Sequence, residues 1–247
     1  MITIKEVRDP WFNLRQNLYK NVEPKVELLG VTAMFETELD LLEFLHGNSF
    51  TSLAPDRIPG HVAALSHMSE KTPEGEVKLT KNLLKMTPVP HLGPFEFMQW
   101  IFKIQGITKS CVTQFDRHRV GAGFVQMSKR YMDANRTGYV YETLGYLEEA
   151  VVVDLLDSSA AHNKASDELY NRFILKGATK EDARKRLPVS MATGTWVHLN
   201  TASLRHFFTL RLDSHAEWEI RRMANVMYKS AMQVAPAHFI NLIEGVE

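Results

Sequence analysis

The chain contains a single cysteine, Cys111, among its 247 residues. One thiol cannot close an intrachain disulfide or build a cysteine-based zinc site. The ten histidines are scattered, and none of them falls in the HExxH spacing of zinc hydrolases. We therefore expect neither a disulfide framework nor a metal site, and we interpret Cys111 as a small, buried, apolar side chain.

Long apolar runs are also missing from the sequence. No stretch of about eighteen apolar residues occurs, so we expect no membrane-spanning helix and no membrane partner. The N-terminal segment MITIKEVRDPWFNLRQ carries charges where a secretory signal needs an apolar core. Because a lone thiol also suits a reducing compartment, these features together predict a cytoplasmic protein.

The chain has no excess charge of either sign. Lys and Arg together number 29, as do Asp and Glu, so the net charge is zero. General nucleic-acid binders carry a global excess of basic residues, and we therefore expect no nucleic-acid partner. The P-loop, a GxGxxG motif after a strand and the GxSxG motif are absent too. The sequence thus lacks the marks of an NTPase, a Rossmann dehydrogenase and a serine hydrolase.

The composition that remains, 45% apolar and 23% charged, is that of a globular protein with a sizeable core. Its patterns predict strands and helices without regular βαβ alternation, which indicates a compact, mixed α/β fold with a central sheet flanked by helices. The predicted strands span 25–35 and 95–106. The predicted helices span 37–47, 78–86, 107–115, 142–175, 179–187 and 214–234. We interpret 1–25 as an N-terminal extension, 26–247 as one domain, and 52–60, with two prolines and a glycine, as a loop.

Two segments carry the clearest periodicity. Apolar residues alternate with polar ones in the first, as in a half-buried strand: Met98, Trp100, Phe102 and Ile104. In the second, Ser214 and Glu217 have the spacing of a capping box. An apolar stripe at helical spacing follows: Ile220, Ala224, Met227 and Ala231.

The segment DRHRVGAGFVQMSKRY, residues 116–131, concentrates positive charge. It holds Arg117, His118, Arg119, Lys129 and Arg130. Buried arginine is costly without an anionic partner, and its planar fork holds phosphate in two places. The VGAG sequence allows the backbone to pass close to a ligand. Taken alone, the segment is equally compatible with a small anionic ligand and with a solvated helix face.

Three further segments hold polar residues beyond what their surroundings need. His91 and Glu96 flank a Gly-Pro turn, although a core histidine beside a surface glutamate would look the same. Arg211 and His215 bracket a predicted helix start, which suits an anion, with an ordinary cap by Asp213 or Ser214 as the alternative. Arg184 lies near a predicted helix C-terminus, where basic residues commonly balance the helix dipole.

The order of six motifs resembles the flavin-dependent thymidylate synthases. In this chain they read HLGPFE, QFDRHR, SKRY, LPVSM, NTASL and LRLDSHAEWEI, and the resemblance runs from about Val26 to the C-terminus. It implies a homotetramer that holds FAD between subunits. It also implies reductive methylation of dUMP to dTMP, with methylenetetrahydrofolate as carbon donor and NADPH as electron donor. Such enzymes need no cysteine nucleophile, which fits the position of Cys111 outside every motif.

The resemblance also implies roles for particular residues. It implies FAD contacts for Ser66, His91, Glu96, Arg117, His118, Arg119, Gln126, Asn200, His206 and His215. It implies contacts with dUMP or a related pyrimidine nucleotide for Gln114, Arg117, Gln126, Ser128, Arg130, Arg184 and Arg211. Within that set Arg211 and Ser128 are the expected catalytic residues, and Arg211 is expected to polarise the uracil because a fixed cation stabilises charge developing on the ring oxygens.

The chain departs from the family pattern at four places. Eight residues separate Arg119 from Ser128 where the family has seven, and Val125-Gln126 replaces an Asn-Glu pair. Ala202 replaces an arginine and His206 an asparagine. Gln126 can hydrogen-bond a base but cannot act as an anion. Two alternatives therefore stay open: a flavin-dependent hydroxymethylase acting on dUMP or dCMP, and a non-catalytic homologue that binds nucleotide or RNA.

Overall fold

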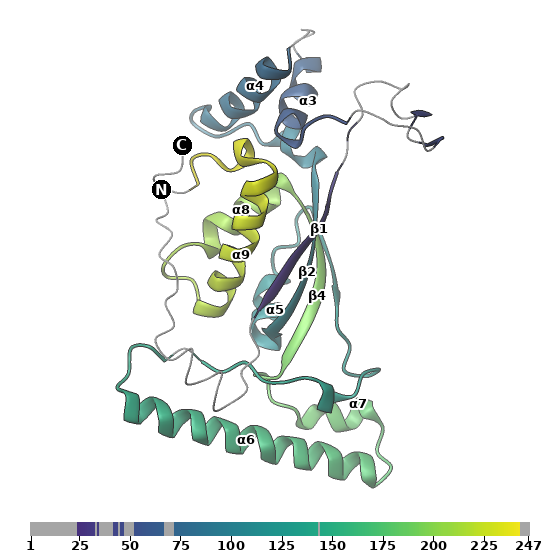
Figure 1. Cartoon of the computed structure of the whole chain (residues 1–247), viewed down its shortest axis with the longest axis vertical. Coiled ribbons are helices and arrows are strands. Elements are labelled where there is room, and N and C mark those ends of the chain that lie inside the picture. Colours follow the sequence, from purple (N-terminus) through teal and green to yellow (C-terminus); the bar gives the residue numbers. More distant parts are fainter. Residues whose placement is uncertain are drawn as a thin grey trace.

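The computed structural model describes residues 24–32, 34, 42–43, 45–46, 52–66, 72–142 and 144–242. The predicted extension 1–25 and the predicted helix 37–47 lie largely outside these residues. The described part is a mixed α/β fold built on one four-stranded antiparallel sheet with the order β1-β2-β4-β3 (Figure 1). The strands are β1 (Lys25–Val31), β2 (Gln99–Thr108), β3 (Ala122–Gln126) and β4 (Ala192–Asn200).

The two central strands supply the middle of the core. Met98, Trp100, Phe102 and Ile104 are fully buried, which confirms the predicted alternation along β2. On β4, whose residues pair with those of β2, Val197 and Leu199 are buried on the same face. Ile101 and Trp196 point the other way and stay exposed, so the sheet has one apolar buried face and one accessible face.

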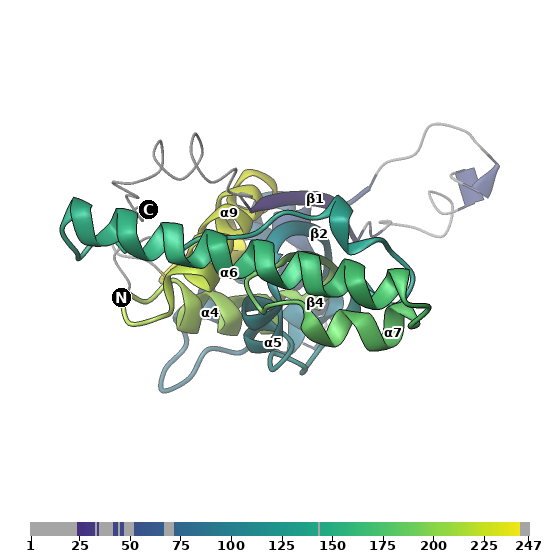
Figure 2. The ribbon, with the colours of Figure 1, turned by 90° about the horizontal axis from the view of Figure 1, so that it is seen from below.

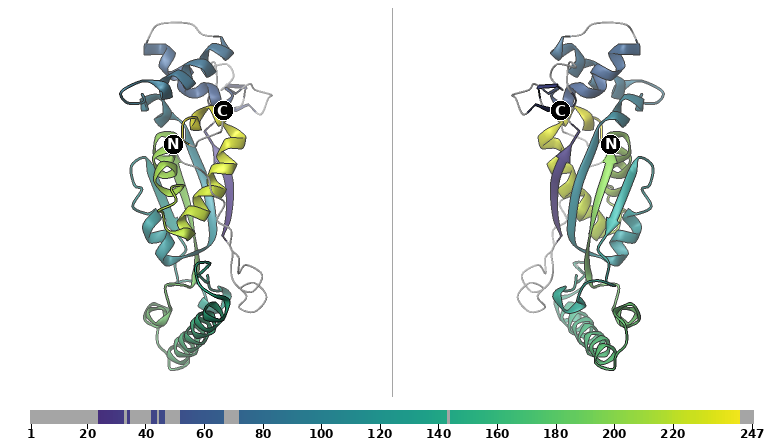
Figure 3. Two further views of the ribbon diagram at one scale, coloured as in Figure 1. Left: turned by 90° about the vertical axis from the view of Figure 1, so that its left-hand side faces the viewer. Right: turned by 90° about the vertical axis from the view of Figure 1, so that its right-hand side faces the viewer.

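Three helices cover the buried face of the sheet (Figures 1 and 3). They are α5 (Lys109–Phe115), α8 (Thr201–Arg211) and α9 (Trp218–Val234). The predicted stripe of Ile220, Ala224, Met227 and Ala231 on α9 is completely buried against the sheet and its neighbours, as expected. Cys111 of α5 is buried in the same core, and burial raises the pKa of its thiol, so it is inert packing as predicted.

Two helical groups lie at opposite ends of the sheet (Figures 1 and 2). At one end, 3-10 helix η1 (Pro55–Arg57) leads into α3 (Ile58–Ser66), which packs on α4 (Pro73–Lys85). At the other end, the long helix α6 (Glu149–Leu175) lies beyond the sheet and crosswise to its strands, beside α7 (Lys180–Ala183) and 3-10 helix η4 (Arg184–Arg186) (Figures 1 and 2). Among the described helices, none has both the length and the apolar content that a bilayer-spanning segment requires.

Several predicted boundaries were wrong. Residues 58–60 begin helix α3 instead of continuing a loop, because Pro59 stands at a first-turn position where its missing N–H costs nothing. The predicted capping box also fails: α9 begins at Trp218, and Glu217 itself is the cap, accepting a 3.2 Å bond from the Ile220 N–H. Helix α6 begins at Glu149, seven residues after the predicted start at 142.

Other predicted helices are confirmed with adjusted ends. Helix α4 begins earlier than predicted, at Pro73, where the Thr72 hydroxyl accepts from the Gly75 N–H. Thr179 caps α7 as predicted, and the chain then tightens into η4 before Pro188. The patterns gave no sign of β3, β4 or α8.

Candidate functional site

The basic segment leaves α5 as a tight turn and continues into β3. The His118 N–H donates to the Phe115 carbonyl at 3.0 Å, and Arg119 Nε donates to the Asp116 carbonyl at 3.0 Å. Gly121 has a φ of +60°, and a Cβ there would lie 2.2 Å from Asn200 Nδ2. Only glycine permits this close passage. The alternative of a solvated helix face is therefore wrong for this stretch.

The turn lines a cavity of about 530 Å³, which we call the arginine cavity. Seven predicted site residues line it: Glu96, Arg117, His118, Arg119, Asn200, His206 and Arg211. Further lining residues were missed by sequence reasoning: Leu92, Val120, Ala202, Ser203 and Leu210. The cavity thus combines three guanidinium groups with an apolar lining, a donor set suited to an anionic ligand with an apolar ring.

Arg211 and His118 interact directly inside this cavity. Arg211 Nε lies 3.1 Å from His118 Nε2. Burial lowers the pKa of His118 to about 4, helped by the nearby charges of Arg211 and His206, so the imidazole is neutral. Because arginine only donates, His118 Nε2 is the acceptor and its proton lies on Nδ1. An uncharged partner therefore holds Arg211 in place without neutralising its charge.

A second cavity, of about 360 Å³, lies between the end of β3 and the segment that follows η4; we call it the lysine cavity. Three predicted site residues line it: Gln126, Ser128 and Arg184. Two cations that the motif analysis did not assign, Lys109 and Lys129, line it as well. No carboxylate of the described chain is among its lining residues. Burial, and then the charge of Lys109, lowers the pKa of Lys129 to about 8.

Gln126 is fixed by charged groups on both sides of its amide. Lys109 Nζ donates to Gln126 Oε1, and Gln126 Nε2 donates to Asp116 Oδ2. An ammonium can only donate and a carboxylate can only accept, so the orientation of the amide is determined. The other carboxylate oxygen of Asp116 is buried and has no hydrogen-bond partner in the described part of the chain.

Helix α5 connects the two cavities, and Glu219 of α9 binds the residue that caps its N-terminus, Thr108. The buried carboxylate accepts the Thr108 N–H at 2.7 Å and the Thr108 hydroxyl at 2.6 Å. Burial raises the pKa of Glu219 to about 7. Thr108 in turn caps α5 by accepting the Cys111 N–H at 3.0 Å. Sequence reasoning missed Glu219, although its place beside His215 and Trp218 in the last motif was a usable signal.

Five predicted site residues line neither cavity: Ser66, His91, Gln114, Arg130 and His215. The Arg130 guanidinium pairs with Glu181 at 3.1 Å. The His215 side chain is 95% exposed and bonds to Asp213 at 2.8 Å. The Ser66 hydroxyl donates to the Ala63 carbonyl at the end of α3. His91 is exposed before 3-10 helix η2 (Gly93–Phe97), and Gln114 is half-buried on α5. A single chain therefore unites most, but not all, of the predicted residues.

The described residues contain no cluster of three or more His, Cys, Asp or Glu side chains suited to a metal ion.

Comparison with known proteins identifies the family of this chain. A family profile described as "Thymidylate synthase complementing protein" matches residues 50–237, more than half of the chain and both cavities. The flavin-dependent thymidylate synthase of Nitratidesulfovibrio vulgaris is 29% identical over 224 residues, which cover 88% of this chain and 86% of that protein. The Geobacter sulfurreducens protein of the same name is 31% identical over 175 residues, covering 71% and 73%. The Pyrococcus horikoshii protein is 36% identical over 157 residues, covering 63% of each. The resemblance inferred from the motifs is confirmed, and the chain belongs to the thymidylate synthase complementing protein family.

Proposed function

We propose that the protein is a flavin-dependent thymidylate synthase, which converts dUMP to dTMP with methylenetetrahydrofolate as carbon donor and NADPH as reductant. The observation that carries this proposal is the pair of cation-rich cavities joined by α5. All four ligands are anionic, and a chain with zero net charge has concentrated cations at these two places. The names of the three relatives described above support the same reaction.

The arginine cavity is the part that suits FAD. Arg117 and Arg119 would hold its pyrophosphate, since guanidinium groups bind phosphate oxygens in pairs. Leu92, Val120 and Leu210 offer apolar surface for its ring system. When bound, the flavin would supply the redox chemistry that the side chains lack. The predicted contacts of Glu96, Asn200 and His206 are compatible with their places in this cavity.

The lysine cavity suits the nucleotide. Arg184 and Ser128 would hold its phosphate, with Gln126 positioned to hydrogen-bond the base. Arg211, which lines the arginine cavity, would polarise the uracil of a nucleotide whose base extends to that cavity, because a fixed positive charge stabilises negative charge that develops on the ring oxygens. The neutral His118 makes this arrangement work, since a protonated imidazole could not accept the Arg211 N–H.

Self-association would complete the site. The accessible face of the sheet keeps the large apolar side chains Ile101, Val125 and Trp196 exposed. Exposed apolar groups on one face are typical of an interface between subunits. The predicted residues that line neither cavity in one chain, such as His91 and His215, would contribute across such an interface. We therefore propose the homotetramer that the family resemblance implies.

One observation favours a second reaction. At position 126 the chain carries an amide, held between Lys109 and Asp116, where the family pattern has a carboxylate. A changed hydrogen-bonding group beside the base could favour capture of the folate carbon by water. The alternative product is therefore a hydroxymethyl pyrimidine nucleotide, formed from dUMP or dCMP.

The mass of the nucleotide product decides between these reactions. The protein would be incubated with FAD, NADPH, methylenetetrahydrofolate and dUMP, and in parallel with dCMP. A product heavier than dUMP by one methylene unit establishes dTMP formation. A product heavier by a further oxygen establishes hydroxymethylation, and absence of any product from either nucleotide contradicts both proposals.

Arg211→Ala tests the assigned role in the same assay. We expect product formation to fall at least about a hundredfold, the scale seen when one charge-stabilising donor is removed from an active site. Flavin absorbance of the purified variant should persist, because Arg117 and Arg119 remain. The matched control is Arg136→Ala, an exposed arginine in 3-10 helix η3 (Ala134–Arg136) that lines neither cavity. Wild-type turnover by Arg211→Ala would remove Arg211 from the mechanism.

A further inference from the structure

The lysine cavity holds more positive charge than the family motifs account for. Lys109 begins α5, Lys129 follows β3 in a turn, and Arg184 begins η4, so three separate elements each contribute one cation. We propose that Lys109 and Lys129 form a like-charge pair that binds the dianionic phosphate monoester of the nucleotide. This inference rests on the proposed function and gives a role in that cavity to two residues to which the family resemblance assigns none.

The nearby carboxylates are already engaged elsewhere. Asp116 accepts a hydrogen bond from Gln126, and Glu181 pairs with Arg130 at 3.1 Å. Neither Lys129 nor Arg184 makes an ion pair with any described residue. Lys109 is held by the neutral Gln126 oxygen, which orients its ammonium without cancelling its charge. Because like charges held together repel, this arrangement is stabilised when a dianion enters.

Lys129 is the sensitive member of the pair. Its amine is half-buried, and burial together with the charge of Lys109 lowers its pKa to about 8. Two cations line the cavity with it, Lys109 on α5 and Arg184 on η4. The carboxylate of Asp116 lies on the other side of Gln126, whose amide donates to it. A bound phosphate would raise this pKa, because an adjacent anion favours the ammonium form. By linkage, affinity for the phosphate is highest while free Lys129 is protonated and falls as the pH rises through about 8.

The phosphate of the nucleotide also titrates, and this limits binding at low pH. The second ionisation of a phosphate monoester has a pKa of about 6, so the dianion prevails only above that pH. Binding should therefore be strongest between about pH 6 and pH 8. A cavity that held the monoanion equally well would show no loss on the acidic side.

The test is calorimetric titration of the flavin-loaded protein with dUMP between pH 5.5 and pH 9.5. For the wild-type protein we expect the dissociation constant to rise at least about tenfold from pH 7.5 to pH 9.5, since one charge-assisted contact is worth that much or more. Lys129→Arg should bind tightly at pH 7.5 and lose this alkaline weakening, because a guanidinium stays protonated. Lys129→Met should bind about tenfold more weakly at pH 7.5 and match the wild type at pH 9.5.

Controls separate the phosphate from the base. Deoxyuridine, which lacks the phosphate, should bind the wild type and Lys129→Met equally. Ionisation of the uracil is common to all variants, so the ratio between wild type and Lys129→Arg isolates the lysine. Lys78→Met, which removes an exposed lysine of α4, should bind dUMP as the wild type does. Thermal melting verifies that each variant is folded.

The outcomes distinguish this inference from the proposed function. If dUMP is converted but Lys129→Met and Lys129→Arg bind it as the wild type does at both pH values, the phosphate assignment is overturned and the function stands. If dUMP is not bound, while inorganic phosphate or dCMP binds with the Lys129-dependent pH profile, the assignment stands and dUMP is the wrong substrate. A Lys129 effect confined to NADPH, and absent with NADH, would place the 2′-phosphate of the reductant there and overturn the assignment.

Discussion

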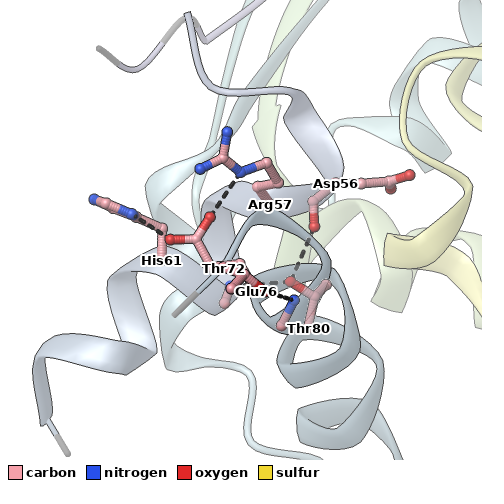
Figure 4. Close-up of polar contacts among 8 residues, drawn as sticks. Asp56, Arg57, His61, Thr72, Glu76 and Thr80 are labelled. Atoms are coloured by element: carbon pink, nitrogen blue, oxygen red, sulfur yellow. Dashed lines mark hydrogen bonds and ion pairs between the residues drawn. The ribbon is translucent and has the colours of Figure 1, made fainter. Parts of the chain in front are cut away.

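At the corner between α3 and α4 the buried carboxylate of Glu76 bonds to Arg57 and His61, whereas three cations line the lysine cavity and no carboxylate lines it with them. Glu76 is 4% exposed and lies 2.7 Å from Arg57 Nε and 2.8 Å from His61 Nδ1 (Figure 4). Thr80 ties the same helices together: its hydroxyl donates to the Asp56 carbonyl and accepts the Gly60 N–H. Here every charge has a partner inside the protein.

The difference indicates which charges maintain the fold and which await a ligand. A buried charge is tolerated in the folded protein only while its partner is present. Replacing either member of such a pair therefore lowers the free energy of unfolding. A group of like charges without a partner gains nothing from folding and becomes favourable when an anion binds. The corner should therefore respond to mutation through stability, and the lysine cavity through affinity.

Gly60→Ala should break the corner most severely. A Cβ at this position would lie 2.0 Å from the Glu76 carbonyl oxygen and 2.7 Å from its carbon, so α3 and α4 must separate. We expect a loss of about 3 kcal/mol in the free energy of unfolding, at the upper end of overpacking effects. Urea unfolding measures it. The control is Gly30→Ala, whose Cβ would meet Ile101 at an ordinary 3.6 Å and should cost less than about 1 kcal/mol. Equal stability of the two variants would contradict the close helix contact.

Glu76→Gln removes the charge but keeps the shape, and should have the next largest effect. The amide presents one oxygen and one NH2 group where the carboxylate presents two oxygens, so the Arg57 guanidinium loses this anionic partner. We expect the free energy of unfolding, measured in urea, to fall by about 2 kcal/mol. This is less than the loss expected when one partner of a buried ion pair is removed completely, because the amide keeps some of the hydrogen bonds. Glu74→Gln, an exposed residue in the same first turn of α4, should change stability by no more than about 0.5 kcal/mol. An equal loss in both variants would mean that the helix dipole, and not the pairing, is what Glu76 serves.

Local periodicity predicted the elements whose role is local. The alternation in β2 and the stripe on α9 were correct because each pattern follows directly from one face meeting the core. Strand β4 was missed because Ala192, Thr193, Gly194 and Thr195 are all buried, so small and polar residues there show no alternation. The first four residues of β4 are covered on both sides, so this half of the strand has no polar face to reveal it.

The site residues show the same limit: motifs along the chain could be recognised, whereas contacts between segments far apart in the sequence could not. Motif order identified the family, and it singled out Arg117, His118 and Arg211, which the fold brings together in one cavity. Lys109 was missed because it reaches Lys129 only through the packing of α5 beside the end of β3, twenty residues later in the chain. Residues 58–60 were misread as part of a loop for a related reason, since the close approach at Gly60 exists only between two packed helices.

Lys109→Gln should have the smallest effect on the free energy of unfolding. The sign of that effect tests the contrast between the α3–α4 corner and the lysine cavity. Lys109 pairs with no carboxylate in the described part of the chain and adds to the repulsion that Lys129 experiences, so its removal costs no ion pair there. We expect the free energy of unfolding without ligand to stay within about 0.5 kcal/mol of the wild type, with any change toward greater stability. Lys103→Gln provides the contrast, because Lys103 pairs with Glu27 at 3.2 Å and its loss should lower the urea midpoint slightly. Both differences should grow at low ionic strength, where charges are screened less. A clear loss of stability in Lys109→Gln would mean that its bond to Gln126 maintains the fold, and the lysine cavity would then resemble the corner instead of opposing it.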